Sequence, residues 1–117
     1  MSDNLRVTVR EEGRLAVMSI SGELDAGTAG GLHTEVVQLL ETHPDLVLDM
    51  SGVAFCDSSG FNALLRIRRR TTEADGWLAL AGPPPQVGRL LALTTGDHAL
   101  FAVYPGQEQA LTAYLGR

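Results

Sequence analysis

Hydrophobic and polar residues alternate near the start of the chain, a pattern typical of a strand with one buried face. The alternation covers residues 6–10 (RVTVR), and the nearly continuous apolar run at residues 15–21 (LAVMSIS) predicts a second strand closer to the centre of a sheet. Between these runs, the polar cluster at residues 11–14 contains Gly13 and predicts a tight turn. The chain is therefore expected to open with a β-hairpin.

Helical and strand-like segments alternate along the rest of the chain. Short apolar runs bounded by turn residues predict three more strands, at residues 46–50, 77–81 and 101–104. Apolar residues at helical spacing predict four helices, over residues 28–42, 58–75, 83–93 and 107–115. Loops are predicted at residues 22–27 and 51–57. This order predicts an α/β fold, a mixed and mostly parallel sheet with about four helices, in one domain over residues 1–117.

Composition narrows the class of protein. The 117 residues are 44% hydrophobic and carry 9 Lys and Arg against 14 Asp and Glu, a net charge of -5. Nucleic-acid binding needs clustered positive charge, so this balance argues against a nucleic-acid partner. The single cysteine, Cys56, cannot form an intramolecular disulfide, which fits a reducing compartment. No apolar run resembles a secretory signal or reaches the roughly 18 residues of a membrane span, so a cytoplasmic protein without a membrane partner is expected.

The motifs of common enzymes and cofactor sites are absent from the sequence. The serines lack the G-x-S-x-G elbow of hydrolases, and His33, His43 and His98 fall on or beside helices other than the one that follows the serines. With one cysteine and no histidine pair at helical spacing, no zinc set can form. Neither Gly-rich nucleotide motif occurs, although nucleotide binding by another geometry stays open. The chain is expected to be no enzyme and to carry no cofactor or metal.

The most informative stretch runs from residue 46 to residue 70 (LVLDMSGVAFCDSSGFNALLRIRRR). A buried strand leads into a loop that delivers Asp57, Ser58, Ser59 and Gly60 to the start of a helix. Serine is a favoured N-cap at that position, but a cap needs only one of the two serines. The free amides of a helix N-terminus stabilise a phosphate, whereas Asp57 repels it. At roughly 6 Å and an effective dielectric constant near 20, each pair of unit charges costs about 3 kcal/mol before screening.

Two segments together resemble a known family. V-A-F-C-D-S-S-G-F at residues 53–61, with G-E-L-D-A-G-T-A at residues 22–29, is similar to the STAS domain of bacterial anti-sigma factor antagonists. The resemblance covers essentially the whole chain and implies the STAS fold. It implies that the unphosphorylated protein binds an anti-sigma factor with serine-kinase activity and frees the sigma factor. Phosphorylation then dissociates the complex, and a serine phosphatase reverses the modification.

By this resemblance Ser58, rather than Ser59, accepts the phosphate. The acidic setting and the partner surface are implied to comprise Asp25, Thr28, Asp57, Ser59 and Gly60. The free protein is expected to be a monomer. Many members of the family read D-S-S-G-L-G, whereas this chain has Phe61 and Asn62 after Gly60, a departure that bears on which kinase is recognised.

Three other interpretations stay open. The arginine-rich run at residues 66–70 is best explained as a solvated helix face, but a nucleic-acid patch or a contact with acidic groups would use the same residues. Cys56 is expected to be a packed small hydrophobe rather than a redox-sensitive thiol. Finally, the chain could be a constitutive STAS scaffold of a sensory complex, with Ser58 merely capping a helix. A phosphate-sized change in mass separates that alternative from the switch.

Overall fold

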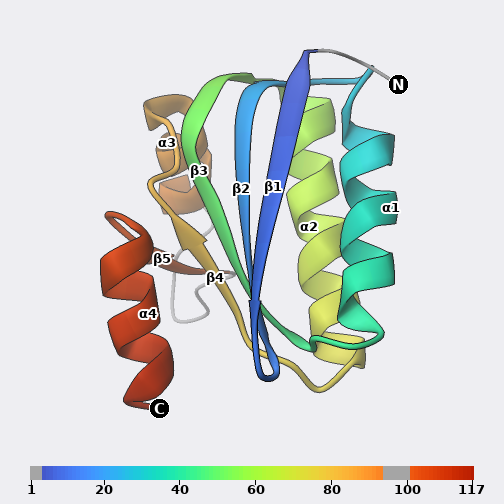
Figure 1. Cartoon of the computed structure of the whole chain (residues 1–117). Helices are drawn as coiled ribbons and strands as arrows, with labels where there is room; N and C mark the ends of the chain where they lie inside the picture. Colours follow the sequence, from blue (N-terminus) through green and yellow to red (C-terminus); the bar gives the residue numbers. More distant parts are fainter. Residues whose placement is uncertain (1–3, 94–100) are drawn as a thin grey trace.

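The structure is a computed structural model that describes residues 4–93 and 101–117. Five strands form one sheet in the order β1-β2-β3-β4-β5 (Figure 1). The strands are β1 (Leu5–Glu12), β2 (Leu15–Leu24), β3 (Asp45–Cys56), β4 (Leu78–Ala81) and β5 (Ala102–Tyr104), and the helices are α1 (Ala29–Leu40), α2 (Ser58–Glu73), α3 (Pro85–Leu93) and α4 (Gln107–Leu115). β1 pairs antiparallel with β2, and the other strands pair in parallel. The predicted element order and the mixed, mostly parallel sheet are confirmed. None of the described helices is long and apolar enough to cross a membrane.

β2 and β3 are longer than the sequence predicted. The loop expected at residues 51–57 is strand up to Cys56, and the one expected at residues 22–27 is strand up to Leu24, because parallel pairing continues to the last pair, Leu24 with Cys56. β3 gains an extra residue relative to β2 between Asp49 and Gly52, and another between Val53 and Phe55. These two β-bulges break the alternation of buried and exposed side chains, so the segment resembles a loop in sequence.

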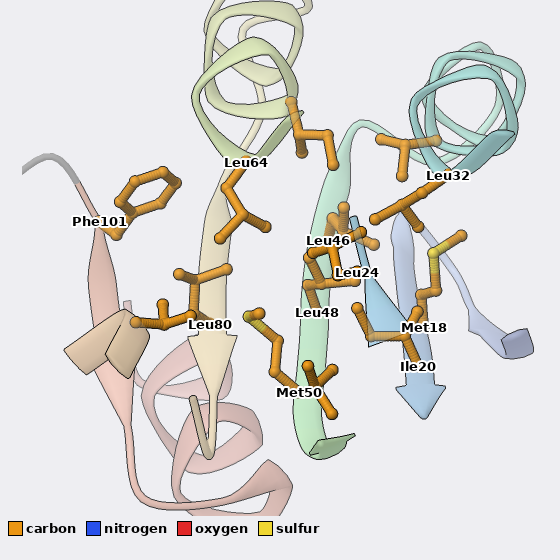
Figure 2. Close-up of a cluster of buried hydrophobic side chains, with 14 of the residues drawn as sticks. Met18, Ile20, Leu24, Leu32, Leu46, Leu48, Met50, Leu64, Leu80 and Phe101 are labelled. Carbon is orange, nitrogen blue, oxygen red and sulfur yellow. The ribbon is translucent and has the colours of Figure 1, made fainter. Parts of the chain in front are cut away.

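The main hydrophobic core lies between the sheet and helices α1 and α2, which cover one face (Figure 1). It is mostly aliphatic, and Figure 2 shows side chains of β2 and β3 meeting Leu64 of α2 and Leu32 of α1. Leu46, Leu48 and Met50 of β3 are fully buried there. Burial of a large aliphatic side chain stabilises the fold by roughly 1.5–3 kcal/mol, so these positions fix β3 in the sheet.

Helix α4 lies on the opposite face of the sheet (Figure 1). Polar contacts hold it at both ends. The carboxylate of Asp45, which is 3% exposed, accepts hydrogen bonds from the Trp77 amide at 3.0 Å and the Tyr114 hydroxyl at 2.6 Å. At the other end, the side-chain amide of Gln107 donates to the Asp49 carboxylate at 2.7 Å. A buried carboxylate is favourable only when hydrogen bonds replace its water, and here the replacement donors also place α4.

Removing the Asp45 carboxylate should loosen α4 and destabilise the fold. We expect Asp45→Ala to lower the free energy of unfolding by about 2–3 kcal/mol, because the half-buried Trp77 amide and Tyr114 hydroxyl lose their acceptor. Urea unfolding followed by circular dichroism measures the change. Glu35→Ala, which removes an exposed carboxylate from α1, is the control and should change stability by less than about 0.5 kcal/mol. Equal effects of the two substitutions would contradict the role assigned to Asp45.

Candidate functional site

The carboxyl ends of β2 and β3 meet the first turns of α1 and α2 at one end of the sheet, the upper end in Figure 1. Leu24 pairs with Cys56 as the last residues of the two strands, and the Asp57 amide donates to the Leu24 carbonyl at 3.3 Å. The segments that follow the strands therefore lie side by side. Ligands and partners of parallel sheets commonly bind at this end of the strands. The structure thus brings both sequence motifs together in one place.

Asp57, and neither serine, caps helix α2. The Asp57 backbone is extended, with φ -99° and ψ -169°, and its carboxylate accepts a hydrogen bond from the Gly60 amide at 3.0 Å. The prediction that a serine caps this helix is wrong, because Asp57 occupies the non-helical position one residue earlier. Ser58 is exposed and Ser59 is half-buried, and neither hydroxyl has a hydrogen-bond partner within residues 4–93 and 101–117. The Ser58 hydroxyl is therefore accessible to solvent and is not engaged in a hydrogen bond with the described residues.

Gly60 allows α2 to begin unusually close to the sheet. A Cβ atom at this position would lie 2.5 Å from the Leu24 carbonyl oxygen and 2.8 Å from the Cys56 sulfur. Both distances are shorter than atoms can approach without displacement, and the first obstacle is backbone. Any other residue here must push the first turn of α2, with Ser58 on it, away from β2. Gly60 belongs to the site as the residue that positions it.

The loop before α1 is ordered by Thr28. The Thr28 hydroxyl donates to the Glu23 carbonyl at 2.8 Å and accepts from the Asp25 amide at 2.9 Å, and its side chain is buried. The Asp25 carboxylate also accepts from the Gly27 amide at 2.9 Å. Thr28 therefore holds the loop that carries Asp25, rather than presenting its own side chain at the surface. Asp25 itself is half-buried and follows β2 just as Asp57 follows β3.

The site carries negative charge that its surroundings do not neutralise. Within the described part of the chain, no salt bridge involves Glu23, Asp25 or Asp57. The first turns of α1 and α2 contain no acidic residue, so the acidic groups sit just outside the helices. The result is an acidic rim around two helix N-termini, which themselves favour anions.

The arginine-rich run lies farther along α2 and makes local contacts. Arg66 is 3.3 Å from the ring nitrogen of His33, and Arg70 pairs with Glu73 at 3.8 Å. Burial lowers the pKa of His33, and the nearby Arg66 and Arg70 lower it further. These contacts place the two arginines on the exposed seam between α1 and α2, beyond the first turn that carries Ser58.

The remaining candidate ligands lie outside the site. His43 is half-buried and lies 3.7 Å from Glu11 at the opposite end of α1, and His98 falls outside the described residues. No group of three His, Cys, Asp or Glu side chains that could hold a metal ion occurs in the ranges 4–93 and 101–117. This end of the sheet carries the hydroxyl groups of Ser58 and Ser59 and the carboxylate groups of Asp25 and Asp57.

Cys56 is a core residue, as predicted. Its side chain is buried against Leu24 and Gly60. Burial, together with the neighbouring Asp57 carboxylate, raises the pKa of the Cys56 thiol to about 11. A thiol with so high a pKa is almost wholly protonated near neutral pH and is a poor nucleophile.

Sequence reasoning missed two features of this site. Asp57 followed by Gly60 at the third helical position fits an aspartate cap and could have been recognised as such. Phe55 was expected inside a loop, but it lies in β3 with its side chain 46% exposed, directly opposite Glu23 of β2. Nothing in the sequence separates an outward-facing phenylalanine from a core one, so only the structure shows it.

Comparison with known proteins gives consistent matches. A family model described as STAS domain matches residues 6–110. The anti-sigma-F factor antagonist RsfB of Mycobacterium tuberculosis is 37% identical over 75 residues, 63% of this chain, and the match spans only 58% of that relative's length. The crystal structure of an anti-sigma factor antagonist from Mycobacterium paratuberculosis superposes with a TM-score of 0.80 at 30% identity, over 97% of this chain and 96% of that one. The Bacillus cell fate determinant SpoIIAA in its phosphorylated form has the same fold, with a TM-score of 0.77 at 16% identity over 93% and 99% of the two chains.

Two glycine substitutions should have opposite effects on stability. Gly60→Ala is expected to lower the free energy of unfolding by about 2 kcal/mol, because its methyl group collides with the Leu24 carbonyl and the first turn of α2 must move. Gly31→Ala, inside α1 where a Cβ would contact nothing within 4 Å, should stabilise the protein by about 0.5–1 kcal/mol. Thermal and urea unfolding measure both. A neutral Gly60→Ala would show that the close approach is not required.

Native Cys56 should resist thiol reagents. The rise of its pKa from 9.0 to about 11 lowers the thiolate fraction at pH 8 about a hundredfold, and burial restricts access further. We expect iodoacetamide to label the folded protein at least about a hundred times more slowly than the protein in guanidinium chloride, as followed by mass spectrometry. Ser51→Cys in a Cys56→Ala background is the exposed control and should react quickly when folded. Rapid labelling of native Cys56 would contradict this assignment.

Proposed function

The chain belongs to the STAS domain family, and from that membership we propose that it acts as an anti-sigma factor antagonist switched by phosphorylation of Ser58. In the unphosphorylated form it binds an anti-sigma factor that is also a serine kinase, and the bound anti-sigma factor releases its sigma factor. The observation that carries the proposal is the free, exposed Ser58 hydroxyl on the first turn of α2, immediately after the capping Asp57. The names of the mycobacterial relatives support the antagonist role.

The first turn of α2 suits a phosphoserine. The Gly60 amide is used by Asp57 and the Phe61 amide donates to the Asp57 carbonyl, whereas the Ser58 and Ser59 amides bond to no described residue. Free amides at a helix N-terminus stabilise phosphate oxygens, so the phosphorylated chain can retain its fold. Ser58 is more exposed than Ser59 and is the better acceptor for a kinase.

Release follows from the charge that phosphorylation adds. A kinase must bring the γ-phosphate of ATP to the Ser58 hydroxyl, so the partner surface facing Ser58 is itself anionic when nucleotide is bound. Phosphoserine adds a charge of about -1.5 to -2 beside Asp57. At roughly 6 Å and an effective dielectric constant near 20, each pair of unit charges costs about 3 kcal/mol before screening, which is about two decades in affinity. A serine phosphatase restores binding by removing the phosphate.

The remaining parts of the proposal follow from this role. The chain supplies the phosphoacceptor and a binding surface, and the kinase and phosphatase supply the catalysis. It needs no cofactor and acts in the cytoplasm, where sigma factors function. In the alternative of a constitutive STAS scaffold, Ser58 serves only as the helix cap, but that role belongs to Asp57.

Phosphorylation of Ser58 can be tested directly. The protein is incubated with ATP and each candidate serine-kinase anti-sigma factor from the same cell, and its intact and peptide masses are measured. We expect one added phosphate on Ser58, its absence from Ser58→Ala, and its presence on Ser59→Ala, the matched control. Ser58→Ala should stay bound to the kinase in ATP, and Ser58→Asp should bind about a hundredfold more weakly.

Two outcomes would overturn the switch. Stable binding to a kinase without any phosphate would leave a constitutive binder. Wild-type affinity of Ser58→Asp in a pull-down would show that added charge does not drive release.

A further inference from the structure

Three residues before Ser58, a β-bulge turns an aromatic side chain outward. Gly22 pairs with Val53, and the next residue of β2, Glu23, pairs with Phe55, so Ala54 is an extra residue in β3. After the buried Val53, regular alternation would point residue 55 into the core and residue 56 outward. The bulge reverses this order, and Cys56 is 6% exposed whereas Phe55 is 46% exposed. Bulges often re-aim side chains in this way next to functional sites.

Phe55 is close enough to Ser58 to share one interface with it. Three residues of chain span at most about 11 Å, so the two Cα atoms cannot be farther apart. A specific interface covers about 800 Å² on each partner and includes residues separated by more than this distance. The other large exposed apolar side chains of the described chain (Val9, Val103 and Leu115) lie on β1, β5 and α4.

Carboxylates flank the phenylalanine. Glu23 is the cross-strand neighbour of Phe55, and Asp25 and Asp57 follow the last pair of β2 and β3. None of the three has a salt-bridge partner between residues 4 and 93 or 101 and 117. An aromatic residue within an uncompensated acidic rim is complementary to an apolar pocket with cationic side chains at its edge.

We propose that Phe55 is the apolar anchor of the surface that binds the anti-sigma factor, and that this partner offers an apolar pocket with Arg or Lys side chains facing Glu23 and Asp25. The inference rests on the proposed function and names the chemistry of its partner. Aromatic side chains are enriched among the few residues that dominate binding, and the polar residues around them exclude water. Phe55 supplies affinity, and Ser58 supplies the switch.

The affinity of Phe55 variants tests the proposal. The probe is the anti-sigma kinase that phosphorylates Ser58, held with a non-hydrolysable ATP analogue so that no phosphate is transferred. Phe55→Ala should weaken binding about thirtyfold, and Phe55→Leu, which keeps an apolar group, should weaken it less. Val103→Ala, matched in exposure on β5, should bind within twofold of wild type. Thermal unfolding of each variant verifies that it is folded, and the Leu variant decides the matter should the Ala variant unfold.

The charge of the rim is tested with the same probe. Glu23→Gln should weaken binding and reduce its dependence on salt, whereas Glu108→Gln, an exposed position in the first turn of α4, should change neither. A salt dependence left unchanged by Glu23→Gln would overturn the cationic rim.

The outcomes separate the inference from the function. Equal affinities of wild type and Phe55→Ala for the kinase would overturn the anchor and leave the switch intact. Conversion of a dimer into a monomer by Phe55→Ala, with kinase affinity unchanged, would assign the surface to a second copy of the chain and overturn the inference. Failure of the wild type to bind any anti-sigma kinase would overturn both the proposed function and the anchor.

Discussion

The contact between the first turn of α2 and the ends of β2 and β3 is the constraint on which the site depends. Gly60 leaves no room for a side chain between the helix and the Leu24 carbonyl, so the helix start is fixed by backbone rather than by adjustable side chains. The same contact buries Cys56 and directs the Asp57 carboxylate to the Gly60 amide. Ser58 follows the capping Asp57 directly, so the same contacts fix where its backbone lies. The backbone of Ser58 is therefore fixed while its hydroxyl stays exposed, which is what the proposed recognition by a kinase requires.

Charge at the site is arranged in two layers. The free amides of the helix N-termini favour an anion, while Glu23, Asp25 and Asp57 lie outside them without cationic partners among the described residues. A small anion attached to Ser58 would meet the amides, whereas an approaching partner surface would meet the carboxylates. One arrangement can therefore tolerate a covalent phosphate and still respond to it at an interface. Of these two layers, only the outer one, formed by the carboxylates, would contact the partner.

The sequence predicted the order of the elements well because alternation and helical spacing are strong wherever one face is buried. Residues 15–21 and 46–50 are such runs, and both lie in central strands. It failed at residues 51–55, where two bulges remove the alternation and the Ser-Gly pair resembles a turn. It also assigned the cap to a serine, because aspartate and serine cap equally well and only the backbone angles tell which residue lies outside the helix. The outward direction of Phe55 follows from a bulge of one residue, and no local pattern encodes it.

Among the described residues, β3 has no paired strand on the β4 side beyond residue 49, since β4 pairs only with residues 46–49. The part of β3 that leads to Ser58 is thus an overhang, and its exposed positions, among them Ser51, Ala54 and Phe55, contribute little to the core. Substitutions there can accumulate without loss of the fold. Paralogues within one cell could therefore diverge along this overhang until each binds only its own partner. Several signalling pathways could then use the same fold without cross-reaction.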